Sequence, residues 1–363
     1  AYASREKISS SGSVQKNKVI NEETSYGYVI PWHGIKTVNL VCQLLKKGIL
    51  LRYAEQPFEV NGNKFERGAI IILRTANKAF GNTLWTNVRE AANAMNIKLY
   101  PVSTGFVDKG FDFGSDKVHP FKAPKVALLT GEGINSNAAG EIWHFFDHQL
   151  NYPLTLINAT EVAGADWHEI DVLIMPDGNY QFLSDKAQAE AFKNWISNGG
   201  RVIALESAVA ALSRADFGIK VKKAEDSDKK DDKAGYEALR KFEERDRDYL
   251  RNITPGSIFR VELDNTHPLA YGYPAFYHTL KMDGNVYEFM KEDGWNVGTI
   301  RKDNQVAGYV GERLKDRLKD GLVFGVQQIG GGSVTYLTDN VLFRSFWENG
   351  KLLLCNAVFL VGQ

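Results

Sequence analysis

The sequence has few cysteines, no excess of either charge and no long apolar run. Its 363 residues include only Cys42 and Cys355, too few for a disulfide framework or a cysteine-based zinc site. Lysine plus arginine number 44 and aspartate plus glutamate also 44, so no basic excess favours a nucleic-acid or anionic-membrane partner. No apolar run approaches the roughly 20 residues of a membrane span, and residues 1–19 have no signal-peptide core. A hydrophobic content of 44% and an aromatic content of 12% predict a folded chain of about two domains.

The larger C-terminal part has the pattern of a doubly wound α/β domain. Four short apolar segments predict its strands: residues 126–129, 154–157, 172–175 and 202–205. The first is continuously apolar, which is typical of a parallel sheet that is covered on both faces. Helical spacing alternates with these strands, so we predict a flavodoxin-like parallel sheet within residues 120–363.

Other segments predict the organisation around that domain. Residues 25–119 show helix-then-strand twice and predict a smaller α/β layer, with 104–124 expected to act as a linker rich in glycine and phenylalanine. Residues 1–24 are polar and predict a poorly ordered lead-in. Residues 220–251 carry 11 Lys or Arg and 10 Asp or Glu, and predict a charged insert made of a solvated linker and an exposed helix.

A glycine-rich turn follows the first strand of the larger domain. Gly131-Glu132-Gly133 leads through Asn135 to Ser136, which is part of a dinucleotide fingerprint. The third glycine is replaced by Ser136, and no acidic residue ends the next strand. We therefore favour a tight turn in which Asn135 or Ser136 caps the following helix.

Histidines offer two further candidate sites. His144 and His148 stand four residues apart on a predicted helix, a spacing that suits metal ligands, but no third ligand is evident. The neighbouring aromatic residues Trp143, Phe145 and Phe146 favour packing against the sheet. His267 lies in Asp264-Asn-Thr-His-Pro, where turn chemistry is the favoured interpretation.

The junction at Glu206 and Ser207 runs directly from a strand into a helix. Such turns form nucleophile elbows, because they expose a side chain at the carboxyl edge of the sheet. Ser207 could serve as the nucleophile and Glu206 as an acid or base. The usual flanking glycines are absent, and no histidine can be paired with Ser207 from the sequence, which disfavours a serine hydrolase triad.

Several segments together resemble one protein family. The C-terminal region of large, secreted bacterial carboxypeptidase A-like zinc peptidases, with its class I glutamine-amidotransferase-like domain, is similar to this chain over about residues 25–363. Residues 28–32 through 67–73 resemble the connecting α/β region of those proteins. The other matching segments are Pro124-Lys-Val-Ala-Leu-Leu-Thr-Gly-Glu-Gly133, Ala139-Gly-Glu-Ile-Trp-His144, Asn198-Gly-Gly-Arg-Val-Ile-Ala204, Asp264-Asn-Thr-His-Pro-Leu269, Leu337-Thr-Asp-Asn-Val-Leu-Phe-Arg344 and Asn356-Ala-Val-Phe359.

Departures from the family pattern carry the functional prediction. Active amidotransferase domains use a thiolate at the elbow and a His-x-Glu after a late strand. Here the elbow position holds Glu206 or Ser207, and Thr338-Asp339-Asn340 follows the late strand, so we predict that the domain is catalytically silent. The H-x-x-E motif of the zinc peptidases is also absent, so we expect no metal or cofactor in this chain and zinc in a domain upstream of it.

The resemblance thus implies a non-catalytic accessory region that docks to the upstream peptidase domain and binds a peptide or glycan ligand. It also implies a secreted or periplasmic location. The predicted binding residues are Gly131, Glu132, Gly133, Asn135, Asp177, Asn179 and Glu206. Two alternatives stay open: a hydrolase or amidotransferase-like enzyme that uses the elbow at Glu206 and Ser207, and a small-ligand binding module.

Overall fold

The computed structural model describes residue 17 and residues 25–222, 241–301 and 304–362. These described residues form two compact units: unit 1, with those that fall within 1–32 and 39–120, and unit 2, with those that fall within 33–38 and 121–363. The predicted lead-in at residues 1–24 lies outside the described part except for Asn17. That side chain accepts a hydrogen bond from the Leu99 amide at 2.9 Å and donates to the Ile97 carbonyl at 2.7 Å.

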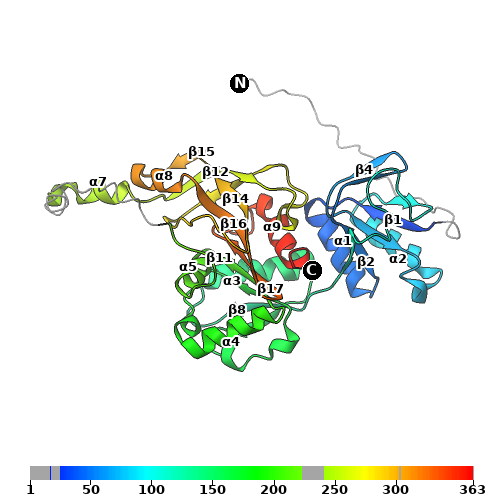
Figure 1. The fold of residues 1–363 in the computed structure, drawn as a ribbon, viewed down its shortest axis with the longest axis horizontal. Coiled ribbons are helices and arrows are strands. Elements are labelled where there is room, and N and C mark those ends of the chain that lie inside the picture. Colours follow the sequence, from blue (N-terminus) through cyan, green and yellow to red (C-terminus); the bar gives the residue numbers. More distant parts are fainter. Residues whose placement is uncertain (1–16, 18–24, 223–240, 302–303, 363) are drawn as a thin grey trace, which may run out of the picture. The chain divides into compact units, whose positions relative to one another are not determined.

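Unit 1 contains a five-stranded sheet in the order β6-β1-β5-β2-β7. Its strands are β1 (Gly27–Ile30), β2 (Leu51–Ala54), β5 (Ile70–Leu73), β6 (Tyr100–Val102) and β7 (Val118–Phe121). Strands β1, β5, β2 and β6 pair antiparallel. Two helices belong to this part of the chain, α1 (Gly34–Lys46), which begins in residues assigned to unit 2, and α2 (Thr83–Ala94), together with the short turn η1 (Lys78–Phe80) (Figure 1).

A small hairpin stands beside this sheet. Strands β3 (Phe58–Val60) and β4 (Asn63–Phe65) pair antiparallel across Asn61 and Gly62. Both turn residues have positive φ, 50° and 69°, as a two-residue hairpin of this twist requires. Asn-Gly is the pair best suited to that turn.

The expected linker at residues 104–124 is wrong, because the segment belongs to unit 1 as far as residue 120. Phe113 is buried in the core of unit 1 beside Phe58, with ring centroids 5.5 Å apart. Asp108 and Lys109 donate backbone hydrogen bonds to Glu59, and β7 joins the sheet. Phe113 therefore packs within unit 1, whereas Phe106 and Phe111 of the same segment are exposed.

Unit 2 is built on a ten-stranded sheet whose main path is β13-β12-β14-β16-β17-β11-β10-β8-β9. The parallel part consists of β8 (Val126–Thr130), β9 (Thr155–Asn158), β10 (Val172–Met175), β11 (Arg201–Leu205) and β17 (Gly332–Leu337). When these five strands are numbered along the chain, their order across the sheet is 2-1-3-4-5, which is the flavodoxin-like order. The predicted doubly wound fold is confirmed.

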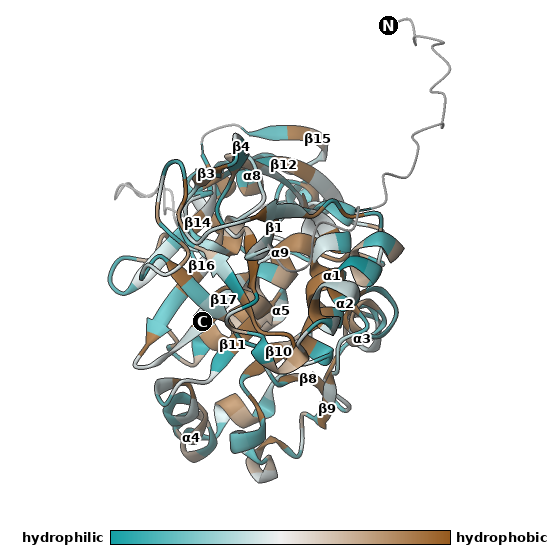
Figure 2. Ribbon diagram, turned by 90° about the vertical axis from the view of Figure 1, so that its right-hand side faces the viewer, coloured by the Kyte–Doolittle hydropathy of each residue, from teal (hydrophilic) through white to brown (hydrophobic). Residues whose placement is uncertain are grey.

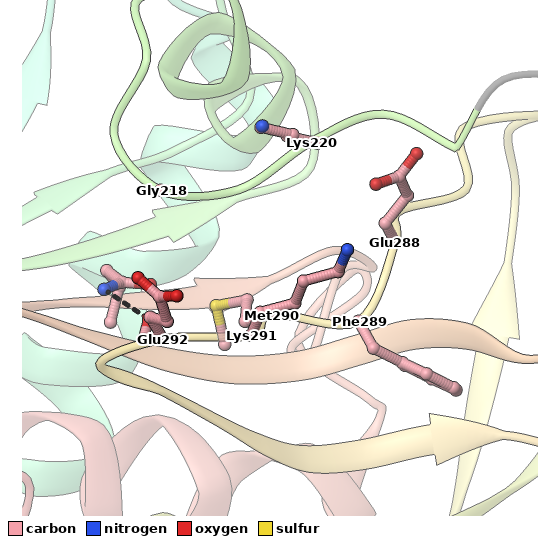
Figure 3. Close-up of a pocket in the computed structure, with 8 residues that line it drawn as sticks. Gly218, Lys220, Glu288, Phe289, Met290, Lys291 and Glu292 are labelled. Carbon is pink, nitrogen blue, oxygen red and sulfur yellow. Dashed lines mark hydrogen bonds between the residues drawn. The ribbon is translucent and has the colours of Figure 1, made fainter.

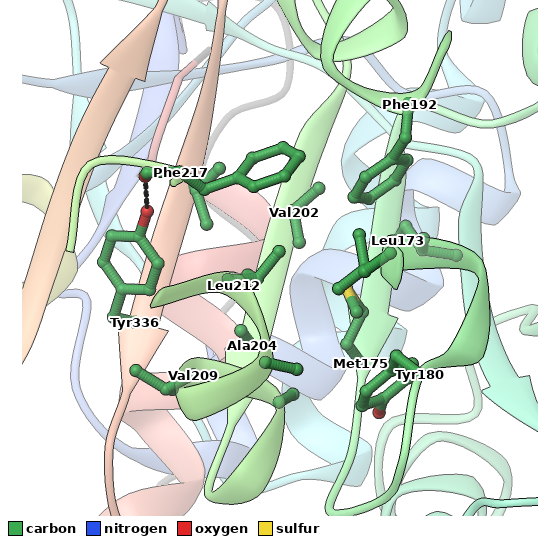
Figure 4. Packing of buried hydrophobic residues seen from close by; sticks show 14 of the residues in the cluster. Leu173, Met175, Tyr180, Phe192, Val202, Ala204, Val209, Leu212, Phe217 and Tyr336 are labelled. Carbon is green, nitrogen blue, oxygen red and sulfur yellow. Dashed lines mark hydrogen bonds between the residues drawn. The ribbon is translucent and has the colours of Figure 1, made fainter. Parts of the chain in front are cut away.

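Helices connect the parallel strands. They are α3 (Ser136–His144), continued by the π-helical η2 (Phe145–Leu150), then α4 (Lys186–Ser197) and α5 (Ser207–Arg214). Shorter turns are η3 (Val162–Gly164), η4 (Trp167–Glu169) and η5 (Gln181–Ser184). Helices α4 and α5 bury side chains such as Phe192 and Val209 against β10, β11 and β17 (Figure 4).

An antiparallel extension follows β17 across the sheet. It comprises β12 (Gly256–Leu263), β13 (Phe276–Lys281), β14 (Gly294–Ile300), β15 (Gln305–Tyr309), which pairs with β12, and β16 (Gly321–Ile329). Its other elements are η7 (Pro268–Ala270), α8 (Glu312–Leu318) and the final α9 (Glu348–Phe359). The C-terminal strands thus complete the second sheet, and α9 is the last helix of the described chain.

The charged insert at 220–251 is described only at its two ends. Lys222 donates its amide to the Val286 carbonyl at 2.7 Å, so residues 220–222 are tied to the fold and do not act as a linker. Residues 223–240 lie outside the described part of the chain. At the far end, η6 (Phe242–Glu244) and α7 (Arg245–Leu250) are exposed, which agrees with the predicted solvated helix.

Candidate functional site at the carboxyl edge of the sheet

Glu206 occupies the turn between β11 and α5 in an unfavourable backbone conformation. Its φ is 51° and its ψ is −119°, a region that normally admits only glycine. The Glu206 amide donates to the Leu337 carbonyl at 3.0 Å, which anchors the turn to the end of β17. Of the two residues proposed for the elbow, Glu206 has the conformation that presents a side chain at the carboxyl edge of the sheet.

Ser207 has a different task. Its hydroxyl accepts from the Gly178 amide at 2.7 Å and makes further hydrogen bonds to the Gly178 carbonyl, at 2.9 Å, and to the Asp177 carboxylate. Among the described residues, no histidine forms a hydrogen bond with the Ser207 hydroxyl. Ser207 therefore joins α5 to the loop after β10, and the geometry does not make it a nucleophile.

The Glu206 carboxyl lies in an acidic and poorly solvated environment. Burial raises its pKa to about 8, and the negative charges of Asp177, Glu141, Asp339 and Asp283 act in the same direction. Glu206 is accordingly mostly protonated at neutral pH. A neutral carboxyl at this position can donate one hydrogen bond and accept others, and it is a weak nucleophile.

The glycine turn and the loop after β10 meet beside the elbow. Asn135 caps α3 by accepting from the amides of Asn137 and Ala138, as predicted, and donates its own side-chain amide to Asp177 at 3.0 Å. The Asn179 amide donates to the Gly133 carbonyl at 2.8 Å. Four of the seven predicted binding residues are thus brought together, and Asp177 links them to Ser207.

Packing explains both glycines of the turn. A Cβ on Gly131 would lie 2.4 Å from the side-chain oxygen of Asn158, and one on Gly133 would lie 2.8 Å from the carbonyl of Asn179. Both residues also have positive φ, 87° and 84°. Close approach to neighbouring loops therefore requires these glycines without any bound pyrophosphate, and Glu132 between them is exposed to solvent.

Sequence reasoning missed Glu141 as part of this edge. Its carboxylate accepts from the side-chain amide of Asn340 and from the Arg344 amide, the latter at 2.7 Å. Burial raises the pKa of Glu141. Glu141 lies in the family-like segment 139–144, and Asn340 and Arg344 lie in the family-like segment 337–344. The resemblance therefore included these residues, but no local pattern shows that residues about 200 apart pair with each other.

A buried ion pair supports the same edge from the antiparallel side. The Lys281 ammonium lies 2.8 Å from the Asp339 carboxylate, and both side chains are only 2% exposed. Asp339 also accepts from the Thr279 hydroxyl at 2.6 Å, and Asp283 lies 3.2 Å from Lys281. This network fixes residues 338–340, where an active amidotransferase would hold its His-x-Glu, against β13.

The two histidine candidates lie away from this edge. His144 and His148 are exposed, with ring centroids 4.9 Å apart. Of the three neighbouring aromatic residues, Phe145 and Phe146 are buried as expected, whereas Trp143 is 53% exposed and its expected packing is wrong. Within the described residues, no group of three His, Cys, Asp or Glu side chains is placed to hold a metal ion. His267 accepts from the Leu269 amide at 3.1 Å, which confirms its role in a turn, and burial lowers its pKa to about 4.

A separate hollow of about 340 Å³ lies between residues 218–220 and 288–292 (Figure 3). Two lysines and two glutamates line it, Lys220, Lys291, Glu288 and Glu292, so its charges balance. It contains none of the predicted site residues.

The described helices include none that is both long and apolar enough to cross a membrane.

No protein family model and no curated protein sequence matches this chain. Solved structures of similar fold include a protein described as ThuA-like from Bacteroides uniformis, with 16% identity over 65% of this chain and 91% of that one (TM-score 0.39). A glutamine amidotransferase from Thermotoga maritima is 10% identical over 65% and 90% (TM-score 0.37). A beta-galactosidase from Bacillus circulans is 14% identical over 65% of this chain and 30% of that one (TM-score 0.39). These similarities concern the fold and carry no information on substrate or reaction.

Proposed function

We propose that this chain is a non-catalytic, ligand-binding accessory region of a secreted zinc metallocarboxypeptidase whose peptidase domain lies upstream. The observation that carries the non-catalytic part is Glu206 in the strained elbow conformation, where a covalent mechanism needs a thiolate. Neither cysteine replaces it, because Cys42 is buried in α1 and Cys355 in α9. The parentage rests on the family resemblance of the sequence segments.

Binding follows from what the elbow offers instead of a nucleophile. A protonated Glu206, together with Asn135 and Asp177 close by, presents donors and acceptors at the carboxyl edge, where α/β sheets commonly bind ligands. We propose a peptide or glycan as the ligand class, the upstream peptidase domain as the partner, zinc in that domain only, and a secreted or periplasmic location.

The direct test is a peptidase assay of this chain beside the full reading frame. The longer protein is expected to release C-terminal residues in a zinc-dependent manner, and this chain to release none. Release by the chain alone would overturn the accessory role. A full reading frame without peptidase activity and without an upstream H-x-x-E would overturn the parentage.

A second candidate function is acid or base catalysis by Glu206 on an amide or a sugar. The raised pKa of about 8 favours it, because a general acid works best with a pKa near the working pH. A hydrolase screen with amide and glycoside substrates, run on the wild type and on Glu206→Gln, distinguishes the two functions. Activity that Glu206→Gln abolishes would replace the binding role with catalysis.

A further inference from the structure

Strand β9 is an open edge of the large sheet. It pairs with β8 on one side and ends the strand order, and no other described strand pairs with its outer side (Figure 2). Its apolar side chain Leu156 is 49% exposed. An edge of this kind offers unpaired backbone groups to another extended chain.

The ladder shows which groups face outward. The Ile157 carbonyl accepts from the Thr130 hydroxyl and the Ala159 amide donates to the Thr130 carbonyl, so these residues face β8. Since residues alternate in direction along a parallel ladder, Leu156 directs both its N–H and its C=O outward. The Asn158 N–H also points outward, while its carbonyl accepts from the Glu161 amide at 2.9 Å.

A groove of about 840 Å³ runs along this edge. Its walls are β9, the connection to β10 and the residues that precede β8. That connection contains the two short turns η3 and η4, whereas α3, α4 and α5 form the other connections between the parallel strands. The missing helix leaves room for an extended segment alongside Leu156.

The charge of the groove indicates which segment fits. Three carboxylates line it, from Glu161, Asp166 and Glu169, against the single ammonium of Lys125. Lys125 lies 2.7 Å from Glu169, so its charge is already compensated. Glu161 and Asp166 are left to attract a cation, and the complementary occupant is basic.

The geometry points to β9 as the docking site of an extended peptide that carries a lysine or arginine and joins the sheet as an additional strand. Outward backbone groups at Leu156 and Asn158 supply the main-chain hydrogen bonds, Leu156 supplies an apolar contact, and Glu161 selects the basic side chain. This inference concerns a different edge from the elbow and does not depend on the function of Glu206.

Fluorescence anisotropy with a labelled hexapeptide of alternating lysine with valine or threonine tests it. The same peptide with alternate backbone amides N-methylated cannot pair as a strand on one edge, and a third peptide carries glutamate in place of lysine. We expect binding of the first peptide only, weakened by added salt because the selecting charges are exposed. Equal binding of the N-methylated peptide, or no binding of the lysine peptide, would overturn the proposal.

Protein variants locate the binding. Glu161→Lys reverses an exposed charge in the groove and is expected to weaken binding of the lysine peptide about ten-fold. Glu190→Lys makes the same change on exposed α4, outside the groove, and should leave binding unchanged. An equal loss of peptide affinity in both variants would show non-specific charge attraction. A concentration-dependent dimer that Glu161→Lys dissociates, in a protein that does not bind the peptide, would identify a second copy as the occupant. Either result would overturn the peptide assignment.

Discussion

At the scale of single residues, protonation of Glu206 makes the free energy of unfolding depend on pH. Its pKa of about 8 in the fold lies above the ordinary value of 4.5. Below about pH 4.5 both the folded and the unfolded state hold the proton, so there is no penalty. Between pH 4.5 and 8 only the unfolded state releases it, so the free energy of unfolding falls as pH rises, and it levels off above pH 8.

Glu206→Gln should remove this dependence. Each unit of pKa corresponds to about 1.4 kcal/mol, so we expect the variant to gain on the order of 4 kcal/mol over the wild type at pH 8, and little at pH 4.5. The strained backbone is common to both proteins and cancels. Urea unfolding at the two pH values measures the difference, with exposed Glu190→Gln as the control. Parallel pH profiles of wild type and Glu206→Gln would contradict a buried, protonated Glu206.

Ser207 is expected to act through stability alone. Ser207→Ala removes the acceptor of the Gly178 amide and the link to Asp177, at a cost of about 1–2 kcal/mol in the free energy of unfolding. Denaturant unfolding measures the loss. A fluorophosphonate probe, which labels activated serines, should leave the wild type and the variant equally unlabelled, and labelling that Ser207→Ala abolishes would show a nucleophile after all.

Sequence reasoning located the elbow but not its geometry. A strand that runs directly into a helix identifies the junction, whereas only the φ of 51° at Glu206 separates it from Ser207 as the presented residue. The contact of Glu141 with Asn340 spans about 200 residues and leaves no local pattern. Local turn chemistry, by contrast, was sufficient to predict the Asn135 cap.

At the scale of elements, predictability follows from burial. Strands β8, β10 and β11 are almost completely buried, and their apolar runs at 126–129, 172–175 and 202–205 were enough to predict them. Strand β7 and the segment before it were missed, because they are held by pairing with distant parts of unit 1 and by the single buried ring of Phe113. The exposure of β9 was also missed, since the apolar residues of segment 154–157 predicted only a strand.

The ion pair between Lys281 on β13 and Asp339 after β17 should be a strong coupling between two elements. Asp339→Asn leaves the Lys281 charge without its principal partner in a buried site, and we expect a loss of about 3–5 kcal/mol. The double variant Lys281→Met with Asp339→Leu should recover much of that loss. Lys319 and Asp316 lie the same 2.8 Å apart but exposed, so Asp316→Asn should cost less than about 1 kcal/mol. Chemical denaturation of these three variants and the wild type measures the free energies of unfolding. Equal losses from Asp339→Asn and Asp316→Asn would contradict the importance of burial.

At the scale of the whole molecule, each unit has its own hydrophobic core. In unit 1, Phe58 packs between Phe65 and Phe113, with ring centroids 5.1 and 5.5 Å away. In unit 2, the ring centroid of Phe192 lies 5.8 Å from that of Trp195 and 5.8 Å from that of Phe217. Figure 4 shows Phe192 and Phe217 within this core. Two cores of this kind give each unit an independent source of stability.

Because the two cores are separate, a core substitution in one unit should destabilise that unit alone. Phe58→Ala and Phe192→Ala each remove a buried ring, which typically costs about 3–5 kcal/mol. Because neither ring belongs to the core of the other unit, we expect hydrogen exchange followed by mass spectrometry to show lost protection in the β1, β2 and β5 peptides for Phe58→Ala. For Phe192→Ala the loss should fall on β10, β11 and α4. Equal loss of protection in both units from either substitution would show that the two units unfold as one cooperative body, since the free energy removed from one core would then be shared by the other.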